Sequence, residues 1–125
     1  MPTESSTIKD YHVHVYFDRE TQTEAERVRD GLAEHFDVEL GRIHFKAVGP
    51  HPQWMYQVKF NPDQFGRLVP WLMLNHEGLN VLVHPQTGDD VADHSDNALW
   101  LGRKLRLKLG FMRKMAAKKR AQAKA

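Results

Sequence analysis

The chain has 125 residues, no cysteine, 18 Lys and Arg against 16 Asp and Glu, and eight histidines. This length suits one domain with its own core, and the lack of thiols excludes disulfides, thiolate metal sites and thiol nucleophiles and favours the reducing cytoplasm. The first nine residues hold no apolar signal segment, and no apolar run reaches the roughly 18 residues of a membrane span. We therefore expect a cytoplasmic protein without a membrane partner.

The charge is unevenly distributed along the chain. Ten of the 18 Lys and Arg lie in residues 103–125, which hold no acid, so the preceding body has eight basic against sixteen acidic side chains. An acidic body argues against a nucleic-acid-binding surface, so nucleic acid is not an expected partner. The predicted organisation is a disordered N-terminus (1–9), one folded domain (10–110) and a basic, helix-prone tail (111–125).

The first strand is predicted over residues 10–17, where apolar and polar side chains alternate. Alternation places Val13 and Val15 on one face. The opposite face then carries three side chains with polar tips: His12, His14 and Tyr16.

Two helices are predicted. The first covers 22–36 and begins with the capping-box spacing of Thr21 and Glu24. The second begins at Asn61, a favourable N-cap residue followed directly by proline. Pro70 removes a backbone donor and should break or kink this second helix.

Alternating or β-branched runs predict four further strands: 43–48, 54–60, a strand from Leu79, and a C-terminal edge strand over 105–109. The segment 98–101 is predicted as a packed turn or short helix. The order of elements is that of an α+β, ferredoxin-like βαββαβ sandwich, with sheet order 4-1-3-2 and helices on one face. The uncovered face of such a sheet usually meets a second copy, so we expect a homodimer forming a dimeric α+β barrel.

Histidines gather on the uncovered face. Antiparallel pairing of the first and last strands brings His12 beside His84, and a strand over 43–48 parallel to the first would bring His44 to the same end. Without thiolates, imidazole ligands suit non-haem iron, manganese or zinc. Any one histidine is equally explained as a partly exposed polar residue, whereas the convergence of four points to a metal site.

Other polar residues have two readings each. His94 and its acidic neighbours follow the last strand of the sandwich and either complete a site or cap a turn; these acids are Asp89, Asp90 and Asp93. His51 stands between two prolines and suits a substrate contact or a rigid turn. Tyr56 is either a core residue or a platform for an aromatic substrate.

Four segments in this order resemble the DOPA 4,5-dioxygenase family of fungi and bacteria: YHVHVYFD, GRIHFKAVGPHPQWMYQVKF, VPWLMLNHEGLNVLVHPQTGDDVADH and ALWLG. The resemblance covers residues 10–109. It implies a small ferredoxin-like or dimeric α+β-barrel protein that performs extradiol cleavage of a catechol ring with O₂ and ferrous iron.

With this resemblance we predict an extradiol dioxygenase for a DOPA-like catechol, with Fe(II) as cofactor and zinc or another divalent ion as an alternative in purified protein. The predicted metal ligands are His12, His14 and His84. The predicted acid–base residues are His44 and His94, and the predicted substrate contacts are Lys46, His51 and Tyr56. Two other functions stay open: a non-catalytic dimeric barrel that binds a metal or a small aromatic ligand, and an adaptor whose basic tail binds anionic partners such as RNA.

Overall fold

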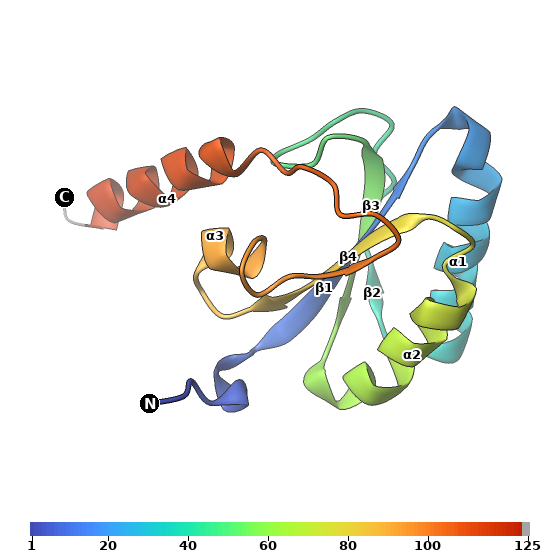
Figure 1. Ribbon diagram of the computed structural model, residues 1–125, viewed down its shortest axis with the longest axis horizontal. Coiled ribbons are helices and arrows are strands. Elements are labelled where there is room, and N and C mark those ends of the chain that lie inside the picture. Colours follow the sequence, from blue (N-terminus) through green and yellow to red (C-terminus); the bar gives the residue numbers. More distant parts are fainter. Residues whose placement is uncertain (124–125) are drawn as a thin grey trace.

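The computed structural model describes residues 1–123 and contains one five-stranded antiparallel sheet (Figure 1). The last two residues of the predicted basic tail lie outside the described residues. The main elements are β1 (Asp10–Phe17), α1 (Gln22–His35), β2 (Glu39–Leu40), β3 (Trp54–Phe60), α2 (Phe65–Asn75), β4 (Asn80–Gln86), α3 (Asp90–Asp93), β5 (Leu99–Leu101) and α4 (Leu109–Ala123). Short 3-10 turns occupy Ser5–Thr7, Arg19–Thr21 and Pro62–Gln64.

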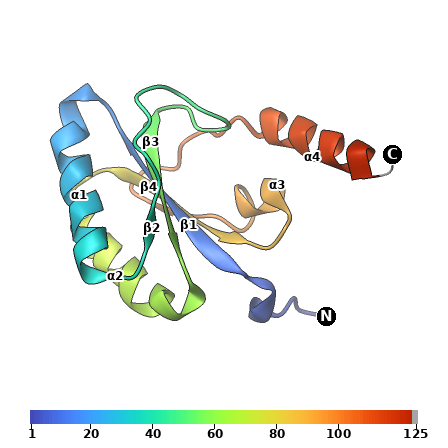
Figure 2. The same cartoon turned by 180° about the vertical axis from the view of Figure 1, so that it is seen from behind.

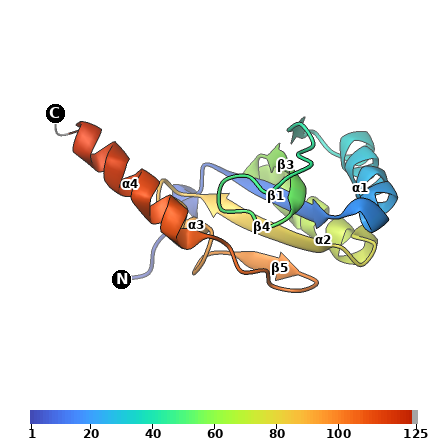
Figure 3. The same ribbon diagram turned by 90° about the horizontal axis from the view of Figure 1, so that it is seen from above.

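The strands lie in the order β2-β3-β1-β4-β5, which confirms the α+β, ferredoxin-like fold and extends it by one strand at the β4 edge. Helices α1 and α2 cover one face of the sheet, and α3 and α4 lie on the other side (Figure 3). Seen from behind, α4 extends away from the sheet beyond α3 (Figure 2). None of the helices within residues 1–123 combines the length and the apolar character that a membrane crossing requires.

The main core lies between the sheet and helices α1 and α2. Strand β1 contributes Val13, Val15 and Phe17, which are all buried, as alternation predicts. The helices contribute apolar side chains at helical spacing: Ala25, Val28 and Leu32 from α1, and Leu68, Val69 and Leu72 from α2. Each of the larger side chains adds about 1.5–3 kcal/mol through burial. This packing holds β1 and β4 side by side at the centre of the sheet.

The predicted strand over 43–48 is wrong. This segment makes a single bridge, between His44 and Met55, and the strand beside β3 is Glu39–Leu40 instead. Pro50 and Pro52 follow closely and lack the N–H donors that a longer ladder needs. The apolar side chain that predicted an inward face, Phe45, is 51% exposed and packs on Trp54 from outside.

The predicted edge strand over 105–109 is also wrong, and so is the turn or helix over 98–101. Residues Leu99–Leu101 form β5 and pair with β4, so the sheet edge is already occupied. We call residues 103–108 the cationic segment, because four of its six residues are Arg or Lys. Its alternation arises from leucines packed on the second face of the sheet rather than from strand pairing.

The helix starts differ in detail from the prediction. The capping box lies about one turn earlier than predicted, at Asp18 and Thr21. The Asp18 side chain accepts hydrogen bonds from the N–H groups of Glu20 and Thr21, and the Asp18 N–H donates to the hydroxyl oxygen of Thr21. Thr21 makes no side-chain cap for α1 itself. Helix α2 continues through Pro70, so the expected break is absent and its last turns still bury Leu72.

Candidate metal centre

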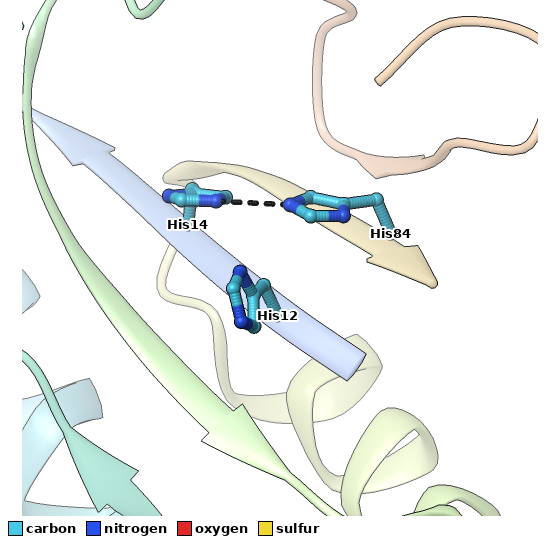
Figure 4. A group of neighbouring side chains, drawn as sticks. All are labelled: His12, His14 and His84. Carbon is cyan, nitrogen blue, oxygen red and sulfur yellow. Dashed lines mark hydrogen bonds between the residues drawn. The ribbon is translucent and has the colours of Figure 1, made fainter. Parts of the chain in front are cut away.

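Five histidines converge on the face of the sheet that α1 and α2 leave uncovered. We call this group the histidine cluster: His12, His14, His51, His84 and His94. Strand register brings His12 directly opposite His84, and His14 follows two residues along the same face (Figure 4). The remaining two come from the loop before β3 and from the end of α3.

The rings are close enough to share a ligand. The Nε2 atoms of His14 and His84 are 3.1 Å apart, and the ring centroids of His84 and His94 are 3.9 Å apart. Two sets of three histidines each place one nitrogen per ring within 4.8 Å of the others: His12, His14 and His84, and His14, His51 and His94. Because His14 belongs to both sets, it is the centre of the cluster.

Backbone carbonyls determine the tautomers of two rings. The Nδ1–H of His84 donates to the Pro85 carbonyl at 2.9 Å, and the Nδ1–H of His94 donates to the Asp90 carbonyl at 2.8 Å. A carbonyl can only accept, so Nε2 of each ring in its neutral form carries the lone pair, and that of His84 lies at hydrogen-bond distance from Nε2 of His14. This is the outer-shell arrangement that orients imidazole ligands around a metal.

The geometry at His14 fits a divalent metal ion. Its ring is 2% exposed, and its Nδ1 is buried without a hydrogen-bond partner. Nitrogens bound to one ion at about 2.0–2.1 Å lie about 3 Å apart, which matches the spacing between His14 and His84. An all-imidazole donor set also suits iron, zinc and copper better than magnesium or calcium.

Burial favours the neutral form of four imidazoles of the cluster. Burial lowers the pKa of His84 to about 3 and that of His51 to about 4, with nearby histidines adding to the effect. Burial also lowers the pKa of His14 well below its usual value and that of His12 to a smaller extent, where the Asp10 carboxylate opposes the shift. Neutral imidazole is the form that binds metals, so these rings need not lose a proton at neutral pH.

A cleft of about 300 Å³ opens beside the cluster, and His94 of the cluster also lines this cleft. Its other lining residues come mainly from β5 and the cationic segment: Ser95, Trp100, Lys104, Leu105, Arg106, Leu107 and Leu109. Trp100 stacks on Tyr16 with ring centroids 5.9 Å apart, and the Tyr16 hydroxyl hydrogen-bonds to Nδ1 of His51 at 2.7 Å. The cleft therefore reaches the cluster at His94.

Comparison with known proteins agrees with this site. The model of the Dopa 4,5-dioxygenase family matches residues 11–111, which include the whole histidine cluster. The chain belongs to the DOPA 4,5-dioxygenase family. Membership in this family indicates a dioxygenase-type enzyme that acts on a small molecule with O₂. The fold and the buried histidines agree with that class.

Individual relatives support the same assignment. A Nostoc punctiforme protein, whose crystal structure is described as that of a "putative dioxygenase", is 52% identical with a TM-score of 0.90, over 91% of this chain and 99% of that one. The "Uncharacterized 21.2 kDa protein" of Botryotinia fuckeliana is 32% identical over 96% of this chain and 72% of its own length. The "DOPA 4,5-dioxygenase" of Amanita muscaria is 30% identical over 78% of this chain, which spans 46% of that enzyme.

The acidic residues that the sequence offered as further members of the site have other partners. Asp93 is fully buried, and its carboxylate accepts hydrogen bonds from Thr87 and Asn97, while Asp89 caps α3 through the Ala92 N–H. Within residues 1–123, both sets of potential ligands consist of histidine alone. The loop after β4 thus serves mainly to hold His94 over His84.

Three predicted site residues lie away from the cluster. His44 was expected at the His12 end of the sheet, but it bridges Met55, whose β1 partner Tyr16 lies at the other end. Lys46 is exposed in the same loop and does not reach the histidines. Tyr56 lies on the helix-covered face with no exposed surface and donates its hydroxyl to the Ala25 carbonyl at 2.7 Å, so it is not among the residues of the cluster.

Tyr16 and the cleft residues were missed as site residues. Alternation had placed Tyr16 on the histidine face, and this was the available signal. The partnership of Tyr16 with His51 joins residues 35 positions apart and depends on the path of the loop between them. Lys104 and Arg106 appeared as the outer side of an edge strand, so their position at the cleft had no sequence signal.

Proposed function

We propose that this chain is an extradiol ring-cleaving dioxygenase that uses ferrous iron and O₂ to open the ring of a catechol. The observation that carries the proposal is the pair of Nε2 atoms of His14 and His84, 3.1 Å apart in a buried, neutral histidine cluster. Membership in a family named for a catechol dioxygenase supplies the reaction class. The similarly named Amanita enzyme supports a DOPA-like substrate.

His12, His14 and His84 would hold the iron, as the first set of converging nitrogens suggests. Ferrous iron at this position supplies the electron exchange that a catechol and O₂ cannot perform directly with one another. In the reaction, the ring carbon–carbon bond beside the diol breaks, and both atoms of O₂ enter the product, a muconic semialdehyde.

His94 is the proposed proton acceptor. It is the member of the cluster that lines the cleft, and its Nδ1–H is committed to the Asp90 carbonyl. Nε2 is therefore free to take a catechol proton and to return it later in the cycle. His44 is not carried into this proposal, because of its position at the opposite end of β1.

His51 and its hydroxyl partner orient the site. With Nδ1 of His51 held by Tyr16, the imidazole is kept against His14, with ring centroids 4.2 Å apart. Trp100, Leu105 and Leu107 pack around the Tyr16 side of this group and exclude water from it. A dry surrounding strengthens the electrostatic interactions of the reacting groups.

We also infer that the protein works as a cytoplasmic homodimer. The support is a cysteine-free sequence and a ferredoxin-like sheet whose second face is covered in part by α3 and the cationic segment, while α4 extends away from it (Figure 2). Light scattering during size-exclusion chromatography at micromolar concentration would give twice the mass of the chain. A monomeric mass would contradict the dimer without affecting the ring-cleavage proposal.

Anaerobic reconstitution with ferrous iron, followed by air and a panel of catechols, tests the ring-cleavage proposal. We expect a yellow semialdehyde band and one O₂ consumed per catechol, both lost in His84→Ala. If the iron-loaded protein gives neither a band nor oxygen uptake with any catechol, the proposal is wrong. The histidine cluster would then belong to a module that binds a metal without oxidising a substrate.

A further inference from the structure

The cleft beside the histidine cluster has a one-sided charge. Two cationic side chains, Lys104 and Arg106, line it together with Trp100 and three leucines. Asp and Glu are absent from its lining. A ligand in this cleft therefore meets two positive groups and an aromatic surface, with no carboxylate to receive a cation.

These two cations are available to a ligand. Within residues 1–123, the ion pairs involve other basic residues, namely Arg27, Lys59 and Lys119. Lys104 and Arg106 are exposed at the cleft and have no acidic partner in this part of the chain. Arginine also offers a planar pair of donors that matches a carboxylate.

The cationic segment is held firmly in place next to the cluster. Leu105 and Leu107 pack into the second apolar cluster around Tyr16, Met55 and Leu82. The Lys108 N–H donates to the Pro50 carbonyl at 2.8 Å, directly before His51. These anchors therefore hold Lys104 and Arg106 at the cleft, where Leu105 and Leu107 both line the cleft and pack on the second apolar cluster.

The relative positions of the groups suggest how a catechol would lie. His94 lies at the boundary of cluster and cleft, so the diol belongs at that end. A side chain on the opposite edge of the ring then extends along the cleft toward the cationic segment. Its terminal charge would meet Lys104 and Arg106.

We propose that this cleft selects catechols whose side chain ends in an anion and carries no ammonium group. The preferred substrate is thus a dihydroxyphenyl alkanoate, which is DOPA-like in its catechol ring and carboxylate and lacks the ammonium group. This inference rests on the proposed ring cleavage and adds the charge of the substrate to it. Two partly exposed charge contacts favour the anion over its neutral analogue by about tenfold, and an ammonium group in the same cleft is disfavoured.

Four catechols with two- or three-carbon side chains of different charge provide the test. They are 3-(3,4-dihydroxyphenyl)propanoate, L-DOPA, 4-ethylcatechol and dopamine, which carry an anion, a zwitterion, no charge and a cation. We expect kcat/KM of the iron-loaded enzyme to decrease in that order from the propanoate to dopamine, with the propanoate about tenfold above 4-ethylcatechol. Raising the salt concentration should reduce this advantage and leave 4-ethylcatechol unaffected, because ions screen exposed charges.

Charge reversal identifies the residues responsible. Lys104→Glu and Arg106→Glu should each lower kcat/KM for the propanoate by about fivefold, raise it for dopamine and leave 4-ethylcatechol within twofold. Arg103→Glu is the matched control, because Arg103 is an exposed arginine of the same segment that does not line the cleft. It should leave the order of the four substrates unchanged.

The outcomes separate this inference from the proposed function. If 4-ethylcatechol is cleaved but the propanoate is no better than L-DOPA or dopamine, the charge selection is wrong and ring cleavage stands. If no catechol is cleaved, anaerobic binding of the propanoate and dopamine to the zinc-loaded protein still tests the cleft. Tighter binding of the propanoate that Arg106→Glu reverses would support it, and equal binding would overturn it.

Discussion

The two faces of the sheet use the same strands in opposite ways. On the face covered by α1 and α2, β1 presents Val13 and Val15 to an apolar core, and the one tyrosine hydroxyl buried there, that of Tyr56, has a carbonyl partner. On the other face, β1 presents His12 and His14 to further imidazoles. The first face gains stability by burying apolar surface, whereas the second buries polar rings that water would otherwise solvate.

Buried polar atoms without a hydrogen-bond partner occur in both parts of the described chain. Nδ1 of His14 and Oδ1 of Asp10 belong to the strand face, and Nε of Arg29 and Oε1 of Gln64 belong to the helical segments. Each such atom costs about 1–3 kcal/mol when left unpaired. Of the four, Nδ1 of His14 belongs to the histidine cluster, and the following changes test the separation of the two faces.

The largest expected effect is on activity. His84→Ala removes one of the two nitrogens that lie 3.1 Å apart, so iron binding and O₂ uptake should fall by more than the ~100-fold that loss of an outer-shell partner costs. The matched control is Val83→Ala, one residue earlier and on the core face. Iron content and oxygen uptake of both variants measure the effect, and an active, iron-replete His84→Ala would contradict the site.

A substitution on the opposite face should lower stability and leave activity nearly unchanged. Leu72→Ala leaves a cavity between α2 and the sheet, where Leu72 is fully buried, and should lower the free energy of unfolding by about 2–5 kcal/mol. Urea denaturation measures this loss. The folded fraction should retain kcat/KM within twofold, and a larger decrease would mean that the two faces are coupled.

The metal-free protein should lose stability in mild acid. The folded pKa values of His84 and His51, about 3 and about 4, lie below the value of about 6.5 for unfolded histidine. Between pH 6.5 and pH 4 the unfolded chain therefore binds more protons, and the free energy of unfolding decreases by about 1.4 kcal/mol per pH unit for each ring. Urea titrations across this range measure the slope.

A variant identifies the source of this slope. His84→Gln should reduce it by the contribution of one ring, whereas Leu72→Ala should lower the whole curve without changing its slope. An unchanged slope in His84→Gln would show that other groups cause the acid sensitivity.

Two Tyr→Phe substitutions, one on each face of the sheet, should have smaller effects on stability and activity. Tyr16→Phe and Tyr56→Phe each remove one buried hydrogen bond of 2.7 Å, and each should cost about 1–3 kcal/mol of stability. Only Tyr16→Phe should also lower kcat, because it frees the ring of His51. Steady-state kinetics beside urea denaturation distinguish the two, and equal kinetics would remove Tyr16 from the site.

The smallest effect is expected at an exposed ion pair between α3 and α4. Lys119 in α4 forms an exposed ion pair with Asp90 at 3.7 Å, and Lys119→Ala should change stability by less than about 1 kcal/mol. Thermal melts at low and high salt measure it. A larger loss would mean that α4 supports α3, and through it His94.

The sequence by itself determined the fold class and the convergence of three of the five histidines of the cluster. Period-two alternation in β1 and a β-branched β4 were enough to place His12, His14 and His84 on one face, because strand geometry is local and antiparallel pairing follows from the order of elements. The family resemblance rested on the same segments.

Only the tertiary structure decided the rest. His51 reaches Tyr16 through an irregular loop, His94 reaches His84 from a one-turn helix, and the cationic segment lies on the sheet face because β5 already occupies the edge. These contacts join residues distant in sequence through segments without a repeating pattern, so local spacing carries no signal for them. Alternation at 43–48 and 105–109 predicted strands that do not form, because alternation carries no information about a pairing partner. Phe45 is 51% exposed, and Leu105 and Leu107 pack on a sheet face without joining a strand ladder.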